Sequence, residues 1–230
     1  GAVPANRVRA LLSCMFNKVA MADGVQWWRE PTTPVTRSIR FREVKRRRHA
    51  TPAEFPPIAR ELDRLLEAYP REVTACYAIL RAGTRVTEML GLRRDEIDAS
   101  GRAVLTEHKT DRTGDVRTII LAPTVLAMIG RLPAYPCGRV FGGVDRWRVR
   151  GVWVLARNAA GIKDLQLRDF RRTFASVAET RGVSLDQIGE VFDHGSTQTT
   201  AGYAWLFDDA RRAIVHDTAS ASETLMKRSE

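Results

Sequence analysis

Two short β-rich runs stand alone in an otherwise helical sequence, and this limits the folds open to the chain. The runs cover residues 103–106 and 116–121, and a polar segment with Asp111 and Gly114 separates them. Their composition and spacing predict one β-hairpin. The segments on either side have helical periodicity. The sequence therefore predicts a mixed, mainly α-helical fold around a small antiparallel β-sheet, and it contains no internal repeat.

Capping residues mark where two of the helices begin. Thr51 and Glu54 form a capping pattern, and the two prolines that follow at positions 56 and 57 break or restart the helix. Ser184 and Gln187 form a second capping box further along the chain. Each pattern predicts a helix immediately after it.

Two further helices are expected before the hairpin. The first runs from about residue 72 to residue 82, and Gly83 is its expected stop. The second is short, covering residues 85–90, with Thr84 as its capping residue and Gly91 at its end. The two helices should therefore meet at a tight turn.

Positive charge is concentrated in one segment of the chain. Lys and Arg number 37 against 27 Asp and Glu, a net charge of +10, which favours a polyanionic partner such as nucleic acid. Residues 37–48 hold seven basic residues and one acidic residue. We interpret this segment as a strap across a phosphate backbone, with a solvated charge run as the alternative. The predicted DNA-binding residues are Arg37, Arg40, Arg42, Lys45, Arg46, Arg47 and Arg48.

The chain opens with an amphipathic helix, predicted from Asn6 to about Ala22. Its apolar stripe includes Val8, Leu11 and Met15, and one such helix cannot bury its own face. The stripe needs either the main domain or sister helices upstream, and the first residue is Gly, so we expect a piece of a longer protein. We predict the last helix of a truncated N-terminal domain at 1–30, a basic linker at 31–50 and the main domain at 51–230.

Composition also excludes several classes of protein. With 230 residues, 44% of them apolar, the chain can bury a full core. No apolar run approaches the roughly 18 residues of a membrane helix, and the three scattered cysteines lack metal-ligand spacing. We expect a cytoplasmic protein with no membrane partner and no metal site, associated with the nucleoid when bound to DNA.

An ordered set of residues, each from a separate segment, suits chemistry on a phosphate. Arg85 and Glu88 lie three apart on one predicted helix face. Arg171 comes much later, His194 follows it after 23 residues, and Tyr203 follows nine residues after that. This set resembles the catalytic domain of the tyrosine recombinase (phage integrase) family, over about residues 6–206.

The resemblance implies a role for each residue. Arg85 and Arg171 are implied to grip the phosphate, with Glu88 supporting Arg85. Lys109 is implied to protonate the leaving 5′-oxygen and Tyr203 to attack the phosphorus. The complete implied set is the catalytic residues Arg85, Lys109, Arg168, Arg171, His194 and Tyr203 with the supporting residue Glu88.

These residue types also make chemical sense without the family. Charge spreads over the phosphate oxygens during in-line displacement, and two forked guanidiniums can stabilise it without a metal ion. A tyrosine phenol forms a reversible phosphodiester link, so the bond energy is stored and neither ATP nor Mg²⁺ is expected. The resemblance further implies double-stranded DNA as partner, a homotetramer on paired sites and an exchange segment from about residue 207.

Two departures from the family pattern leave alternatives open. Arg168 stands where the family usually has histidine, and arginine cannot act as a base. Asp193 stands where glycine usually precedes the histidine. The leading interpretation is a site-specific recombinase that forms a 3′-phosphotyrosyl intermediate. The alternatives are a type IB topoisomerase-like enzyme and a recombinase-derived DNA-binding protein that no longer cuts, and Arg85 with Glu88 could be a structural salt bridge alone.

Overall fold

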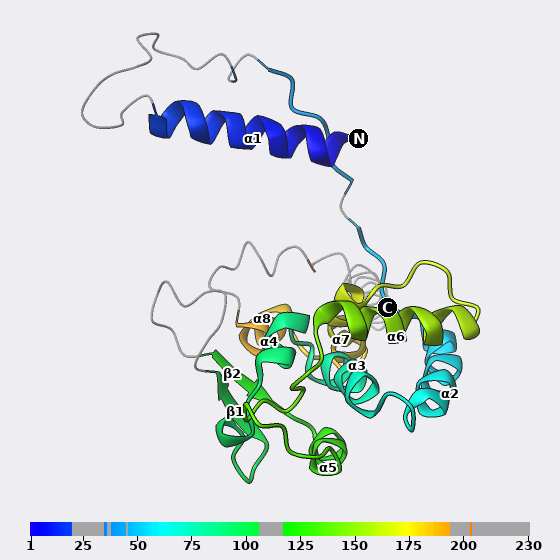
Figure 1. Cartoon of the computed structure of the whole chain (residues 1–230). Coiled ribbons are helices and arrows are strands. Elements are labelled where there is room, and N and C mark those ends of the chain that lie inside the picture. Colours follow the sequence, from blue (N-terminus) through cyan, green and yellow to red (C-terminus); the bar gives the residue numbers. More distant parts are fainter. Residues whose placement is uncertain (20–34, 36–37, 45, 106–116, 194–202, 204–230) are drawn as a thin grey trace, which may run out of the picture. The chain divides into compact units, whose positions relative to one another are not determined.

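The computed structural model describes residues 1–19, 35, 38–44, 46–105, 117–193 and 203 (Figure 1). The chain divides into two compact units, Gly1–Arg47 and Arg48–Glu230. The second unit holds the hairpin and all helices after the first. The predicted assignment of residues 1–30 to a truncated domain stays a prediction.

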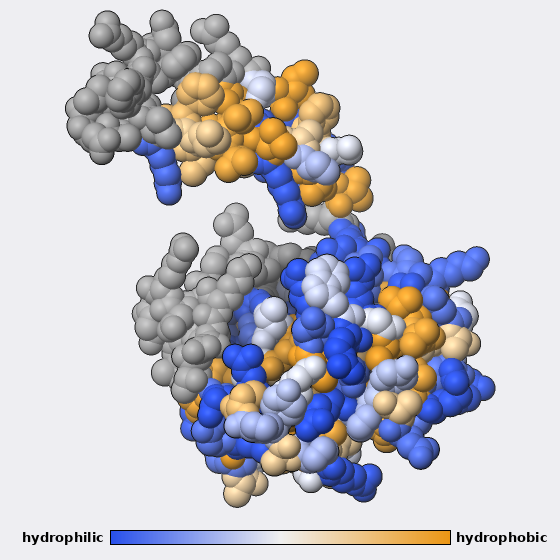
Figure 2. Space-filling model, in the orientation of Figure 1, coloured by the Kyte–Doolittle hydropathy of each residue, from blue (hydrophilic) through white to orange (hydrophobic). Residues whose placement is uncertain are grey.

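The first unit contains helix α1, Ala2–Val19, which begins earlier than the sequence pattern predicts. Residues 38–44 run beside it, since the Asn6 amide donates 2.7 Å to the Phe41 carbonyl and Arg9 donates 2.9 Å to the Ser38 hydroxyl. Apolar side chains gather over the surface of α1 (Figure 2). The predicted apolar stripe is exposed on this helix, including Val8, Leu11, Leu12 and Met15.

Helix α3, Pro70–Ala82, lies at the centre of the second unit (Figure 1). It is buried along most of its length, as expected for a helix whose apolar residues occur on all sides. Around it pack α2 (Phe55–Leu65), α5 (Pro123–Gly130), α6 (Arg146–Ala159) and α7 (Phe170–Glu179). The described part of the unit also contains the short helices α4 (Val86–Gly91) and α8 (Leu185–Phe192) and 3₁₀ turns at Pro52–Glu54, Arg94–Glu96 and Leu167–Asp169.

Most helix boundaries agree with the capping patterns. The Thr51–Glu54 capping box precedes a 3₁₀ turn, and α2 then starts at Phe55 with prolines in its first turn. Ser184 caps α8, since its hydroxyl accepts 3.3 Å from the Gln187 N–H. Gly83 ends α3 in the left-handed conformation, at φ 62°. These expectations are confirmed.

The expectation that Thr84 caps α4 is wrong. The Thr84 side chain is buried, and its hydroxyl has no hydrogen-bond partner among the residues described. Arg85 is the extended residue before the helix, and its N–H donates 3.2 Å to the Glu88 carboxylate. A carboxylate inside the first turn thus replaces the hydroxyl as the capping group.

The hairpin prediction is confirmed by strands β1, Arg102–Leu105, and β2, Arg117–Ile120. They pair antiparallel, with Ala103 opposite Ile119 and Leu105 opposite Arg117. Ala103, Leu105 and Ile119 are buried, so one face of the ladder lies on the core. The fold is mainly α-helical with a small antiparallel sheet, and the connection between the strands lies outside the described residues.

The core of the second unit holds a buried tryptophan on α6. The Trp153 ring packs edge-on against Phe170, with centroids 4.6 Å apart, and its indole N–H donates 3.0 Å to the Leu165 carbonyl. This contact joins α6 to the start of α7. It therefore helps to fix the helix that carries Arg171.

The described ranges can be searched for membrane helices, metal-ligand clusters and disulfides. Among them, no helix combines the length and apolar character needed to cross a membrane. No group of three or more potential metal-ligating side chains gathers there either. Cys14, Cys76 and Cys137 form no disulfide.

Replacing Trp153 with alanine is expected to lower the free energy of unfolding by about 3–5 kcal/mol, because it removes a fully buried ring and one of the hydrogen bonds to the Leu165 carbonyl. Trp147→Ala on the same helix is the matched control. Trp147 is 57% exposed, so a change within about 1 kcal/mol is expected. Urea denaturation measures both, and equal losses would contradict this account of the core.

Candidate active site

A buried carboxylate, that of Glu88 on α4, joins two guanidiniums. Its Oε1 accepts a hydrogen bond from Arg85 Nη1, and its Oε2 lies 3.5 Å from Arg117 Nη2. The side chains of Glu88 and Arg117 are 3% and 2% exposed, whereas that of Arg85 is 33% exposed. The pair predicted from sequence is therefore present, and Arg85 keeps one side open to solvent.

Arg117 was not among the predicted site residues. It is the first residue of β2, and its Nη1 donates 3.1 Å to the Val191 carbonyl in the last turn of α8. The strand alternation carried a signal, because Arg117 shares a strand face with the buried Ile119 and Leu121. A charge on a core-facing position requires a partner, and Glu88 supplies it.

Arg171, on the first turn of α7, is buried and grips two backbone carbonyls. Its Nη1 donates 2.9 Å to Gly83 O and its Nη2 donates 2.7 Å to Phe192 O. The guanidinium also stacks over the Phe192 ring at 3.9 Å. Gly83 lies two residues before Arg85, so this bond places the two predicted arginines beside each other.

The pKa of Arg171 reflects its burial and the titratable groups around it. Burial and the positive charges of Arg85 and Arg117 together lower the pKa of its guanidinium to about 10, although Tyr203 and the carboxylate of Glu88 act in the opposite direction. Arg171 therefore stays protonated at neutral pH. The two carbonyl oxygens that it binds are neutral acceptors.

Tyr203 lies beside the same residues. Its ring packs edge-on against Phe192, with centroids 5.3 Å apart, and it contacts the small apolar cluster of Ala175, Ile188 and Phe192. Phe192 thus has the Arg171 guanidinium over its ring and Tyr203 at its edge. The described residues bring Arg85, Glu88, Arg171 and Tyr203 together.

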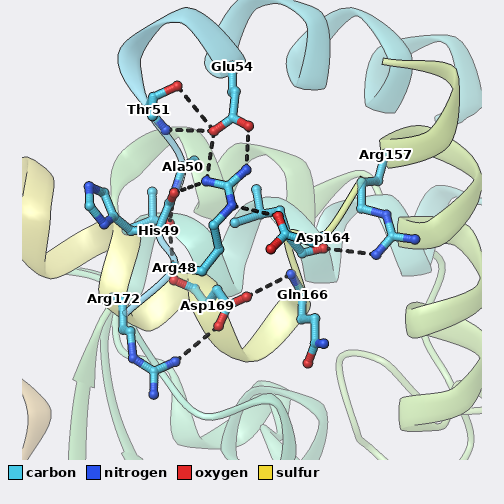
Figure 3. A network of polar contacts seen from close by, with 12 residues as sticks. Arg48, His49, Ala50, Thr51, Glu54, Arg157, Asp164, Gln166, Asp169 and Arg172 are labelled. Carbon is cyan, nitrogen blue, oxygen red and sulfur yellow. Dashed lines mark hydrogen bonds and ion pairs between the residues drawn. The ribbon is translucent and has the colours of Figure 1, made fainter. Parts of the chain in front are cut away.

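A polar network anchors the start of α7 and therefore Arg171. Asp169 is fully buried, and its carboxylate accepts from the Gln166 N–H at 2.9 Å and from Arg172 at 3.0 Å. The Thr173 hydroxyl donates 3.0 Å to the Asp169 carbonyl and accepts from Ala50 N–H. Figure 3 shows this network around the 3₁₀ turn.

Arg48 belongs to the same network. Its guanidinium binds the Glu54 carboxylate and donates 2.9 Å to Asp164 (Figure 3). The hydrogen bond with Glu54 raises the pKa of Arg48, against the effect of partial burial. In this arrangement Arg48 ties the start of the second unit to the chain before α7, and its charge is matched by carboxylates.

The other predicted basic residues divide into two groups. Arg40 and Arg42 are exposed on the segment beside α1, and Arg46 and Arg47 follow them. Arg37 and Lys45 lie outside the described residues. Lys109 and His194 also lie outside them, so their predicted roles stay predictions.

Arg168 lies on the 3₁₀ turn before α7 and is exposed. It lines a surface groove of about 660 Å³ together with Thr87 of α4 and three arginines of α6. Those arginines are Arg146, Arg150 and Arg157. Sequence reasoning missed them, although the alternation of arginine with apolar residues from 146 to 150 was a visible signal.

The groove also contains an exposed aromatic ring. Trp147 lies between two guanidiniums, with Arg146 at 4.5 Å and Arg150 at 5.7 Å from the ring centroid. Thr87 belongs to the first turn of α4, directly after Arg85. The basic groove therefore borders the arginine and carboxylate cluster.

Comparison with curated proteins finds a relative among tyrosine recombinases. No protein-family model matches the chain. The tyrosine recombinase XerC of Herpetosiphon aurantiacus is 23% identical over 171 residues, which cover 70% of this chain and 55% of that protein. The chain thus spans about half the length of the curated relative it matches.

Comparison with solved structures finds integrases and recombinases. The Tn1549 transposon integrase in complex with transposon right end DNA has a TM-score of 0.67 and 17% identity, covering 93% of this chain and 78% of that chain. A lambda integrase dimer bound to a COC′ core site gives 0.66 and 17%, with coverage of 88% and 73%. XerH recombinase bound to difH gives 0.57 and 16%, with coverage of 68% and 49%.

These similarities confirm the resemblance to tyrosine recombinases that the motifs indicated. The chain has the fold of these recombinases and integrases. The arginines, the glutamate and the tyrosine that carried the resemblance are also the residues that this fold gathers.

Replacing Glu88 with glutamine is expected to lower the free energy of unfolding at pH 7 by about 3–5 kcal/mol, because two guanidiniums lose their shared anion. Burial alone would raise the pKa of Glu88, but hydrogen bonding and charge from Arg85 and the charge of Arg117 lower it overall. The stabilisation is therefore full above the ordinary glutamate pKa of about 4.3 and is lost as the pH falls through the lowered value.

The difference between wild type and Glu88→Gln should accordingly shrink in acid, as denaturant titrations from pH 7 to pH 3 would reveal. Glu61→Gln is the matched control, since Glu61 pairs with Arg64, whose side chain is 62% exposed. That change should cost no more than about 1 kcal/mol. A Glu88→Gln loss that does not depend on pH would refute the electrostatic explanation.

Proposed function

We propose that the chain is the catalytic part of a site-specific DNA recombinase, which cleaves and rejoins DNA through a 3′-phosphotyrosyl intermediate. One observation carries the proposal: Arg85, Arg171 and Tyr203, far apart in sequence, lie in one cluster, because Arg171 binds the Gly83 carbonyl two residues before Arg85 and shares the Phe192 ring with Tyr203. Guanidiniums beside a phenol suit a phosphodiester substrate, because the phenol attacks while the cations hold the oxygens.

The proposed first step transfers a phosphoryl group to tyrosine. The Tyr203 phenol gives its proton to solvent water and its oxygen attacks the phosphorus in line; a phosphorus–tyrosyl oxygen bond forms, and the bond to the 5′-oxygen breaks. Lys109 gives its proton to the departing 5′-oxygen. A 5′-hydroxyl of a partner strand then reverses the attack and releases the tyrosine, so the step needs no external energy source.

The guanidiniums have distinct parts in this step. Arg171 is held by two carbonyls and Arg85 by Glu88, so both are fixed before the phosphate arrives. Fixed donors stabilise developing charge without reorganising during the reaction. We assign Arg168 as a donor to phosphate oxygen or backbone, because arginine keeps its proton.

Two basic surfaces are proposed to hold the duplex. One is the linker pair, Arg40 and Arg42, both exposed. The other is the α6 pair, Arg146 and Arg150, in the groove beside Thr87. The resemblance adds a homotetramer on paired DNA sites, with the segment from about residue 207 exchanged between copies.

The native chain is expected to form a covalent adduct with DNA, and Tyr203→Phe is expected to form none, because phenylalanine has no oxygen to attack with. The probe is a library of duplexes of random sequence carrying a nick near each candidate scissile phosphate, which traps the intermediate when the short strand diffuses away. Adducts that survive detergent are isolated and their DNA is sequenced.

Tyr135→Phe is the matched control and should react like wild type, since Tyr135 is exposed and lies outside the cluster. An adduct formed by Tyr203→Phe would contradict the assignment of the nucleophile. Absence of any adduct with the native chain would favour the non-cleaving alternative.

DNA affinity is expected to fall steeply with salt, because phosphate contacts release counterions. Each contact contributes a slope of about −0.9 in a plot of log K against log salt concentration. Alanine at both members of the linker pair, or of the α6 pair, should make the slope less steep by up to about 2. Fluorescence anisotropy with a labelled duplex measures these slopes.

Alanine at Arg60 and Arg64 is the matched control, because both residues are exposed on α2 and the change in net charge is equal. The control should leave the slope unchanged. A flat salt dependence of the native chain, or an equal effect of the control, would contradict the proposed DNA-binding surfaces.

A further inference from the structure

We propose that Arg117 is a positioning residue for the proposed cleavage reaction, which orients Arg85 through Glu88 and fixes the end of α8 that leads into His194. The inference rests on the proposed function. Arg117 is 2% exposed, so it cannot itself reach a DNA phosphate. It acts through the groups that it contacts.

The first contact is with the carboxylate that holds Arg85. Arg117 Nη2 lies 3.5 Å from Glu88 Oε2, while Arg85 Nη1 bonds Glu88 Oε1. Each guanidinium therefore takes one oxygen of the same carboxylate. Oε2 is held by the Arg85 N–H at 3.2 Å and by Arg117, so the carboxylate presents Oε1 to the Arg85 guanidinium in one orientation, and the outward half of Arg85 remains open.

This sharing also leaves positive charge in the site. A carboxylate that served Arg85 alone would neutralise it, whereas Glu88 divides its charge between two cations. Arg171 nearby is held by carbonyls of Gly83 and Phe192, which carry no net charge. Arg85, Arg117 and Arg171 therefore place three guanidiniums near the Glu88 carboxylate, and fixed cations of this kind stabilise the charge of a phosphate diester.

The second contact is with the last turn of α8. Arg117 Nη1 donates 3.1 Å to the Val191 carbonyl, and Arg171 Nη2 donates 2.7 Å to the next carbonyl, that of Phe192. Helix C-terminal carbonyls lack partners within the helix and bind cations well. After Phe192 the chain turns at Asp193, with φ 51°, and His194 follows in the sequence. Two arginines thus fix the point from which His194 departs.

The third link comes from the position of Arg117 in the chain, at the end of the connection between the two strands. Arg117 is the first residue of β2, opposite Leu105, and the connection that contains Lys109 ends at it. One guanidinium therefore joins the base of that connection to α4 and α8. Lysine could form an ion pair with Glu88, but a single ammonium lacks the rigid fork that spans both partners.

The test measures the single-turnover rate of adduct formation on a trapped DNA sequence, at saturating DNA. Arg117→Met keeps the length of the side chain and removes the charge. We expect the rate to fall by roughly 10- to 100-fold while the Kd for DNA stays the same, because the error lies in the placement of Arg85 and not in DNA capture. A rate at saturating DNA that equals the wild-type rate would overturn the inference, even if the rate falls at lower DNA concentrations.

Three companion variants separate positioning from a general loss of fold. Arg102→Met, at an exposed position on the partner strand β1, should react like wild type. Arg117→Lys should give an intermediate rate, and full activity would overturn the link to α8. Adding Glu88→Gln to Arg117→Met should cost little beyond the more damaging single change, because both act through one interaction; additive losses would count against the inference.

Hydrogen exchange provides a measurement that does not depend on cleavage. In Arg117→Met, or in Arg117→Lys if the methionine variant does not fold, amides of α4 and of the last turn of α8 should exchange faster than in Arg102→Met. Changes confined to β2 would overturn the inference. A wild type that forms no adduct but shows this pattern in its variants would refute the proposed cleavage, while the structural link of Arg117 to α4 and α8 would stand.

Discussion

The shared carboxylate of Glu88 is the interaction on which the site depends. It is buried, and its two oxygens meet two guanidiniums from different parts of the chain, Arg85 beside it and Arg117 on the sheet. Removing a carboxylate from water is costly unless cations and hydrogen bonds compensate for the loss. That cost links α4 to β2, because neither the anion nor the buried cation is stable without the other. The same link sets the orientation of the one guanidinium in this group that stays partly open to solvent.

Backbone carbonyls also hold the buried guanidiniums in place. Arg171 binds the carbonyls that end α3 and α8, and Arg117 binds the carbonyl before the latter. Helix ends offer such oxygens because their last carbonyls have no partner within the helix. These acceptors satisfy the donors and leave the charge in place. The guanidiniums of Arg85, Arg117 and Arg171 are therefore held in place by the Glu88 carboxylate and by backbone carbonyls, and fixed cations of this kind suit phosphoryl transfer.

Local signals in the sequence were sufficient for much of the fold. Capping residues placed the starts of α2 and α8, a left-handed glycine placed the end of α3, and β-rich runs placed the hairpin. The exception was Thr84, where the pattern suggested a hydroxyl cap. Its side chain is buried between α3 and α4, and Glu88 caps the helix from inside. Capping rules consider only neighbouring residues. They cannot predict that a side chain is buried in the core, since burial depends on distant segments of the chain.

The order and identity of Arg85, Glu88, Arg171 and Tyr203 were set by the sequence alone, because the arginines and the tyrosine have a chemistry suited to phosphate, the glutamate can pair with an arginine, and the intervals between them form a pattern. Their convergence, and the parts taken by Arg117 and the α6 arginines, were decided by tertiary structure. The physical reason is the distance along the chain over which each signal acts. Sequence periodicity reports which face of one helix or strand a residue occupies, whereas an ion pair between elements depends on how those elements pack. Only the packed fold could show that a strand arginine and a helix glutamate share a buried charge.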